Sequence, residues 1–152
     1  MQDTRNTAAS DGADALKSIE RLQFSDLSLA IDMAGHAGQA VKLLGAVFGA
    51  AVIANKTYVG LALSLLDGGM SYEQLAIAAL GAIGRTTHDD VANLLWTNLF
   101  GAAPTKEQIS PVVALMDGGL SPGALTVLVA DSSLIAEKIN LVGLLQTGVE
   151  FG

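Results

Sequence analysis

The amino-acid sequence predicts a mainly α-helical fold, in which two degenerate three-helix repeats form a compact domain behind a short N-terminal β-hairpin or strand segment. Three observations support this prediction. Apolar residues alternate with a period of two over residues 22–31, as in strands, and cluster at helical spacing from Gln39 onward. The motif Asp-Gly-Gly occurs twice, at residues 67 and 117, in a context that ends one helix and begins another.

The composition predicts a single soluble domain. At 152 residues the chain is long enough to bury a core without disulfides or metals, and it contains no cysteine. The longest uncharged apolar stretch, residues 43–54, is shorter than the roughly 20 residues of a membrane-spanning helix, so we expect a core helix there and no transmembrane segment. The net charge is -7 and the basic residues are scattered, so we expect no nucleic-acid partner.

The first segment, residues 1–38, combines a polar N-terminus with a predicted hairpin. A frame change at residues 25–26 marks the position of the turn. Five apolar residues alternate with polar ones, in one frame before this turn and in the other after it: Leu22, Phe24, Leu27, Leu29 and Ile31. A hairpin that ends the chain's strand region would leave an exposed strand edge, and such edges pair with other strands. We therefore expect a homodimer or a protein partner at this edge.

The two Asp-Gly-Gly motifs predict helix boundaries. Glycine adopts the left-handed conformation that ends a helix without steric cost, and the serine that follows can cap the next helix. Gln74 stands three residues after the first of these serines, as a capping box requires, and Pro122 has the favourable first helical position after the second. We assign eight residues to these structural turns: Asp67, Gly68, Gly69, Ser71, Asp117, Gly118, Gly119 and Ser121.

The helical domain, residues 39–152, is predicted to contain two repeats at about 39–86 and 89–131, followed by a C-terminal helix. The aspartates of the turns lie 50 positions apart, but Phe-Gly-Ala-Ala recurs after 52, so the first copy has two extra residues before its second helix. Pro111 favours, as an alternative, a shorter helix that begins there, with residues 105–109 as a separate turn. The predicted helices cover residues 39–52, 57–66, 72–81, 89–100, 106–116, 122–130 and 133–146, and residues 147–152 form a tail.

Two stretches together resemble a known family. Residues 11–32 read DGADALKSIERLQFSDLSLAID, and residues 35–44 read GHAGQAVKLL. This order resembles the C-terminal region of RTX-type, type I secreted bacterial proteins, in which a strand segment of the form D-x-L-x-x-I-E-R-L-x-F-x-D closes a calcium-binding repeat array. A helical domain of unknown function often follows that segment. The resemblance implies a secreted or cell-surface protein.

The resemblance also implies calcium chemistry and a route of export. Asp11 and Asp14 resemble a remnant of the last calcium-binding turn, although half a site offers fewer oxygens than the six to eight that calcium takes, and a solvated acidic loop is the alternative. The polar N-terminus shows no cleavable secretory signal. An uncleaved C-terminal signal is therefore implied, with which the apolar residues 141–152 are compatible, and a cytoplasmic location stays open.

The remaining candidates for chemistry have structural explanations in the sequence. We interpret His36 as a loop or capping residue, and His88 as a capping residue beside Asp89 and Asp90 at a helix start. The aspartates of the two turns invite a pairing as catalytic carboxylates, but the turns explain them. No serine lies in a G-x-S-x-G motif, and no phosphate-binding or zinc-protease motif is present. We therefore predict no catalytic residue and no cofactor other than calcium, and we expect Trp96 in the core.

These observations favour a noncatalytic structural or interaction module of a type I secreted or cell-surface bacterial protein. One alternative is a domain that binds a small apolar ligand or a lipid, because helices rich in Ala and Gly can leave an apolar cavity. A second alternative is a hydrolase, which a cleft joining His88 to a serine or a carboxylate from elsewhere in the chain would support.

Overall fold

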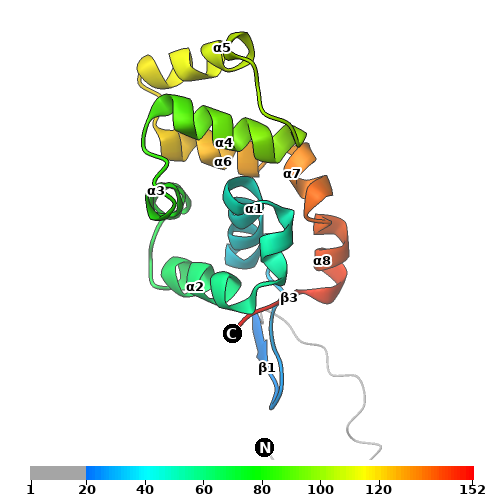
Figure 1. The fold of residues 1–152 in the computed structure, drawn as a ribbon. Coiled ribbons are helices and arrows are strands. Elements are labelled where there is room, and N and C mark those ends of the chain that lie inside the picture. The colour runs from blue at the N-terminus through cyan, green and yellow to red at the C-terminus, as the bar shows by residue number, and fades with distance from the viewer. Residues whose placement is uncertain (1–19) are drawn as a thin grey trace, which may run out of the picture.

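The computed structural model describes residues 20–152, and it confirms the mainly helical fold with a short antiparallel strand pair in front (Figure 1). The hairpin projects from one end of the helical body, and the C-terminus returns beside it. The candidate calcium residues Asp11 and Asp14 lie outside the described residues. Within residues 20–152, no helix has the length and apolar character needed to cross a membrane.

The helices of the two repeats correspond in order and closely in length. The first repeat contains α1 (His36–Phe48), α2 (Lys56–Asp67) and α3 (Tyr72–Ala82), and the second contains α4 (His88–Phe100), α5 (Lys106–Asp117) and α6 (Pro122–Ala130). Helices α1 and α4 have 13 residues each, and α2 and α5 have 12 each. The first helix begins before the predicted Gln39, because the carboxylate of Asp32 accepts a hydrogen bond from the backbone N–H of Ala37.

The predicted end of the first helix, at residue 52, is wrong. Helix α1 ends at Phe48, because Gly49 adopts a positive φ of 91°. The residues that follow form a short 3-10 helix, η2 (Ala50–Ala54), at the place where the first copy has its two extra residues. In the second copy Gly101 ends α4 in the left-handed conformation, and the chain passes to α5 without such a helix.

Both Asp-Gly-Gly motifs end helices as predicted. Gly69 and Gly119 have φ angles of 101° and 117°, in the left-handed region. The backbone N–H groups of Met70 and Leu120 each donate a 3.0 Å hydrogen bond to the carbonyl five residues earlier, and both side chains pack against the core. This geometry satisfies carbonyl groups that a helix end leaves without partners.

The helix starts predicted after the two Asp-Gly-Gly turns are also observed. Ser71 caps α3 and forms a capping box with Gln74, and Ser121 caps α6, whose first residue is Pro122. Thr105 caps α5 and forms a second capping box, with Gln108. These contacts explain where the chain can begin a new helix immediately after ending one.

Two predictions about helix continuity differ from the structure. Pro111 lies inside α5, so the alternative of a shorter helix that begins at this proline is wrong. The predicted C-terminal helix is two helices, α7 (Ser133–Lys138) and α8 (Leu141–Thr147). They are separated at Asn140, which adopts the left-handed conformation with a φ of 53° and caps α8 through its side chain.

The hairpin is the larger part of a three-stranded antiparallel sheet. Strands β1 (Arg21–Gln23) and β2 (Ser28–Ala30) pair with Leu22 opposite Leu29, and the turn lies between them as predicted. The chain end is a third strand, β3 (Val149–Glu150), rather than a tail, and it pairs with the other side of β2. The available edge of the hairpin is therefore β1, as far as residues 20–152 are concerned.

Helix α1 lies at the centre of the core. It packs against α2, α3, α4, α6 and α7, and nine of its residues are buried. Gly45 permits a close approach to the residue after α7, since a Cβ atom at Gly45 would lie 2.6 Å from Cγ2 of Ile139. Its counterpart α4 buries only Val91, Ala92 and Leu95. The first repeat thus supplies the centre of the molecule, and the second repeat covers it.

Candidate functional site

Each repeat positions one histidine against one aspartate. His36, the first residue of α1, donates from Nδ1 to Oδ1 of Asp67, the last residue of α2, over 2.6 Å. His88 and Asp117 make the same contact between α4 and α5 over 2.7 Å. Nδ1 carries the hydrogen because a carboxylate only accepts. The histidines were expected in loops or at helix starts, and the aspartates in turns. In addition to these roles, each histidine binds the aspartate of its own repeat.

The pairing compensates for an unfavourable placement of the aspartate. A helix C-terminus carries partial negative charge, so an aspartate at the end of a helix opposes the dipole of that helix. Within each helix pair, the start of the first helix lies beside the end of the second. The histidine can then interact with the carboxylate of the neighbouring helix, and the contact closes one end of the pair.

The pair in the first repeat belongs to a larger charged cluster. Arg21 of β1 donates two hydrogen bonds to the carboxylate of Asp67, at 2.9 and 3.0 Å, and it also binds Asp32. Burial raises the pKa of Asp67, but the hydrogen bonds and charges of His36 and Arg21 outweigh burial and hold this pKa below its ordinary value. The cluster fastens the hairpin, the start of α1 and the end of α2 to one another.

The pair in the second repeat has simpler surroundings. The carboxylate of Asp90 accepts a hydrogen bond from Thr87, which caps α4, and lies 3.5 Å from Arg85. A shallow depression of about 200 Å³ lies beside the pair, and Asp89, Lys106, Ser110 and Asp117 are its polar lining residues. His88 thus pairs with a carboxylate from another helix rather than with the two aspartates that follow it.

The orientation of each pair is that of a histidine general base. An Nδ1 bound to a carboxylate leaves Nε2 available to accept a proton. Within residues 20–152, however, no hydroxyl group forms a hydrogen bond with either Nε2. The serines of the turns are engaged elsewhere: Ser71 accepts from the backbone of Gln74, and Ser121 accepts from Ala124 and donates to Glu73. As arranged, the pairs join helices.

A separate polar cluster joins the two repeats. Nζ of Lys42 in α1 donates to Oδ1 of Asp131, at the end of α6, over 2.6 Å. The hydroxyl of Tyr72 in α3 donates to the same oxygen over 3.4 Å. Burial raises the pKa of Tyr72, and the carboxylate of Asp131 raises it further. In the described part of the chain, no group of three or more His, Asp or Glu side chains is arranged to hold a metal ion.

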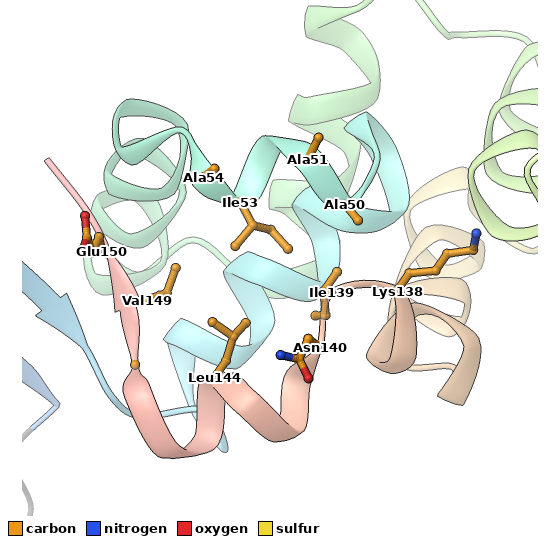
Figure 2. A pocket seen from close by; sticks show the side chains of 11 residues that line it. Ala50, Ala51, Ile53, Ala54, Lys138, Ile139, Asn140, Leu144, Val149 and Glu150 are labelled. Atoms are coloured by element: carbon orange, nitrogen blue, oxygen red, sulfur yellow. The ribbon is translucent and has the colours of Figure 1, made fainter.

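A depression of about 500 Å³ lies between η2 and the C-terminal segment (Figure 2). Ile53, Leu144 and Val149 point toward one another across its floor, whereas the ammonium group of Lys138 extends away from them. Glu150 lies at the opposite rim, 2.5 Å from Nζ of Lys56. The depression is thus an open hollow with an apolar floor, and its charged lining residues are Lys138 and Glu150, of which Glu150 is paired with Lys56.

Comparisons with known proteins give no relative from which a role could be transferred. No family model matches the chain, and neither a curated protein nor a solved structure does.

The sequence contains one signal from which the histidine–aspartate pairs could have been predicted. The chain has only two histidines, and they lie 52 positions apart, the spacing at which Phe-Gly-Ala-Ala recurs.

Proposed function

We propose that this chain is a noncatalytic structural and interaction module of a type I secreted or cell-surface bacterial protein. The roles of the candidate residues support it: both histidines and both turn aspartates join helices, and the turn serines cap them. The resemblance of residues 11–32 and 35–44 to the C-terminal region of RTX-type proteins supports the secreted setting. The module acts by folding and by association.

The observation that carries the proposal is the outer edge of β1. The backbone N–H of Phe24 donates to Leu27 and that of Ile31 donates to Glu20, so this register directs Leu22 toward β2. The backbone groups of Arg21 and Gln23 then face outward. Within residues 20–152, no strand pairs with them. An open edge of this kind recruits another strand, so we propose that two copies of the chain pair through β1.

A proline at Gln23 tests this association. The substitution Gln23→Pro removes an outward N–H, which a partner strand needs, and leaves the bonds between β1 and β2 in place. We expect sedimentation velocity to show a concentration-dependent dimer for the wild type and a monomer for Gln23→Pro. The matched control Gln23→Thr keeps the N–H and should still dimerise. A wild-type monomer at high concentration, or equal dimerisation of all three proteins, contradicts the proposal.

Export through the C-terminal segment needs a test that spares the fold. Deletion of residues 139–152 would remove β3 and the buried side chains of Ile139 and Val149, and would therefore unfold the chain. Val142 and Leu145 of α8 are 71% and 61% exposed, so Val142→Asp with Leu145→Asp removes apolar character without touching the core. We expect reduced release into the medium of the native host. Unchanged release contradicts an export role for α8.

A hydrolase is the rival proposal, and the orientation of the histidine–aspartate pairs favours it. An activated-ester substrate such as p-nitrophenyl acetate distinguishes the two. If the chain is a noncatalytic module, the wild type should hydrolyse this ester at the same rate as the His88→Ala and His36→Ala variants. Turnover that the wild type shows and that either variant loses, with the fold intact by circular dichroism, would favour the hydrolase instead.

A further inference from the structure

An apolar groove lies between α4, α5 and α6 in the second repeat. Its volume is about 150 Å³, and all eight of its lining residues are apolar. Trp96 and Phe100 come from α4, Val112 from α5 and Val129 from α6. We propose that this groove is a binding site for one small, uncharged apolar molecule that carries an aromatic ring or a short alkyl chain.

The lining determines the class of ligand. No charged side chain, hydroxyl or amide belongs to it, so a polar ligand would lose its hydrogen bonds to water without replacement. The volume of the groove is about that of an apolar cavity that holds benzene. The rings of Trp96 and Phe100 already lie against each other, with centroids 4.5 Å apart and planes tilted by 45°, and offer an aromatic surface at the groove.

The positions that line this groove are less buried in the second repeat than in the first. Leu44 and Val47 of α1 hold the positions of Trp96 and Leu99 in α4, and both are fully buried, whereas their counterparts are half-buried. Ala62 of α2 is likewise buried at the position of Val112. These positions are therefore buried in the first repeat, where α1 lies at the centre of the core, and only half-buried in the second, where α4 lies nearer the surface.

The position of α5 explains the opening. In the first repeat α2 packs against α1, α3 and η2, whereas α5 packs chiefly against α4. Only Ile109 and Met116 of α5 are buried. Within residues 20–152, the contact of Asp117 with His88 is the one side-chain hydrogen bond that links α5 to another element. Helix α5 is therefore the least firmly held wall, and a ligand between it and α6 would supply the packing that α5 lacks.

The chain contains a natural reporter, because Trp96 is its single tryptophan. Toluene titrated into the full chain should produce a saturable change in the fluorescence of Trp96 and in the methyl NMR signals of Val112 and Val129. Hydrogen exchange in α5 should slow in parallel. Benzoate, which adds a charge to the same ring, should bind at least about tenfold more weakly. A linear, unsaturable response to toluene overturns the proposal.

Two neighbouring valines provide matched variants. Val112 lines the groove, whereas Val113 lies on the same helix, is also half-buried and lines the polar depression instead. Val112→Phe should fill the groove and weaken toluene binding by about tenfold or more, and Val113→Phe should retain it. Val129→Phe fills the groove from the opposite wall, and it replaces Val112→Phe in this test if Val112→Phe does not fold. Equal binding by these filled variants and the wild type overturns the proposal.

A second copy of the chain is the other conceivable occupant of this face. The groove would then be covered at high protein concentration, and toluene binding would weaken as the protein is concentrated. That outcome overturns the ligand site. Binding that is independent of protein concentration, and that is unchanged in Gln23→Pro, supports it. Toluene binding by Gln23→Pro also tests the two proposals independently. The groove can bind toluene without a dimer at β1, and the dimer can form without toluene binding in the groove.

Discussion

Asp67 and Asp117 hold equivalent positions at the ends of α2 and α5, but their neighbours differ. Asp67 receives hydrogen bonds from Arg21 and His36, whereas Asp117 receives one from His88. The first aspartate therefore joins three elements and the second joins two. The histidine contact is thus common to both repeats, and the first repeat has an additional cation from the hairpin.

Replacement of each carboxylate by its amide measures this difference. Asp67→Asn should lower the free energy of unfolding by about 1 kcal/mol, because it loses the charge opposite Arg21 as well as the histidine contact. Asp117→Asn, the matched control, should lose only about half as much, since no arginine within residues 20–152 binds Asp117. Urea denaturation followed by circular dichroism gives both values. Equal losses would show that Arg21 adds nothing to the cluster.

Acid should weaken the fold partly through Asp67. The pKa of this carboxyl is lower in the folded chain than in the unfolded chain, so its contribution is fully present above the unfolded pKa and is lost as the pH falls through the folded pKa. We expect stability to decline between about pH 5 and pH 2. The decline should be shallower in Asp67→Asn, and parallel curves for the two proteins would contradict the assignment.

At the scale of elements, the contact between α3 and α6 depends on the absence of a side chain at Gly123. A Cβ atom there would lie 2.9 Å from the carbonyl oxygen of Glu73 and 2.7 Å from Cγ1 of Ile77. Gly123→Ala should therefore destabilise the chain by about 1–3 kcal/mol. Gly81→Ala, in α3, meets nothing within 4 Å and should stabilise it by about 0.5–1 kcal/mol. Thermal unfolding of both variants tests this, and a neutral Gly123→Ala would contradict the close approach.

Most helices were predictable because their signals are local. The capping residues Ser71 and Ser121 begin helices at the positions that the sequence indicated. The errors arose where a contact from elsewhere decides the conformation. Strand β3, for example, is defined by its pairing with β2, more than a hundred residues earlier in the chain. The break at Asn140 was missed because its left-handed backbone leaves no periodicity in the sequence.

The candidate site was predictable only in part, for the same reason. The turns at Asp67 and Asp117 follow from glycine and serine in the immediate sequence, but their histidine partners lie 31 and 29 residues away. Local reasoning placed each histidine in its own loop or helix start. The repeat itself offered the missing information, because two contacts that recur in equivalent places indicate a common role.

At the scale of the whole molecule, the C-terminal strand is an integral part of the fold. The backbone N–H of Phe151 donates to Ser28, that of Gly152 donates to Lys56, and Val149 is buried. Deletion of residues 149–152 should therefore lower the free energy of unfolding by about 2–4 kcal/mol. Leu145→Ala, at an exposed position, should change it by less than about 0.5 kcal/mol. Chemical denaturation compares the two, and an unaffected deletion variant would show that β3 does not contribute.

The order of the sheet also bears on how the chain folds while it is being made. Strand β2 is synthesised early, yet one of its two neighbours is complete only when residue 150 has been added. Throughout that interval a nascent chain presents β2 with an unsatisfied side, the condition in which strands misassociate. A chaperone that binds extended apolar segments would therefore find its target in the hairpin of the growing chain, and would lose it once β3 has docked.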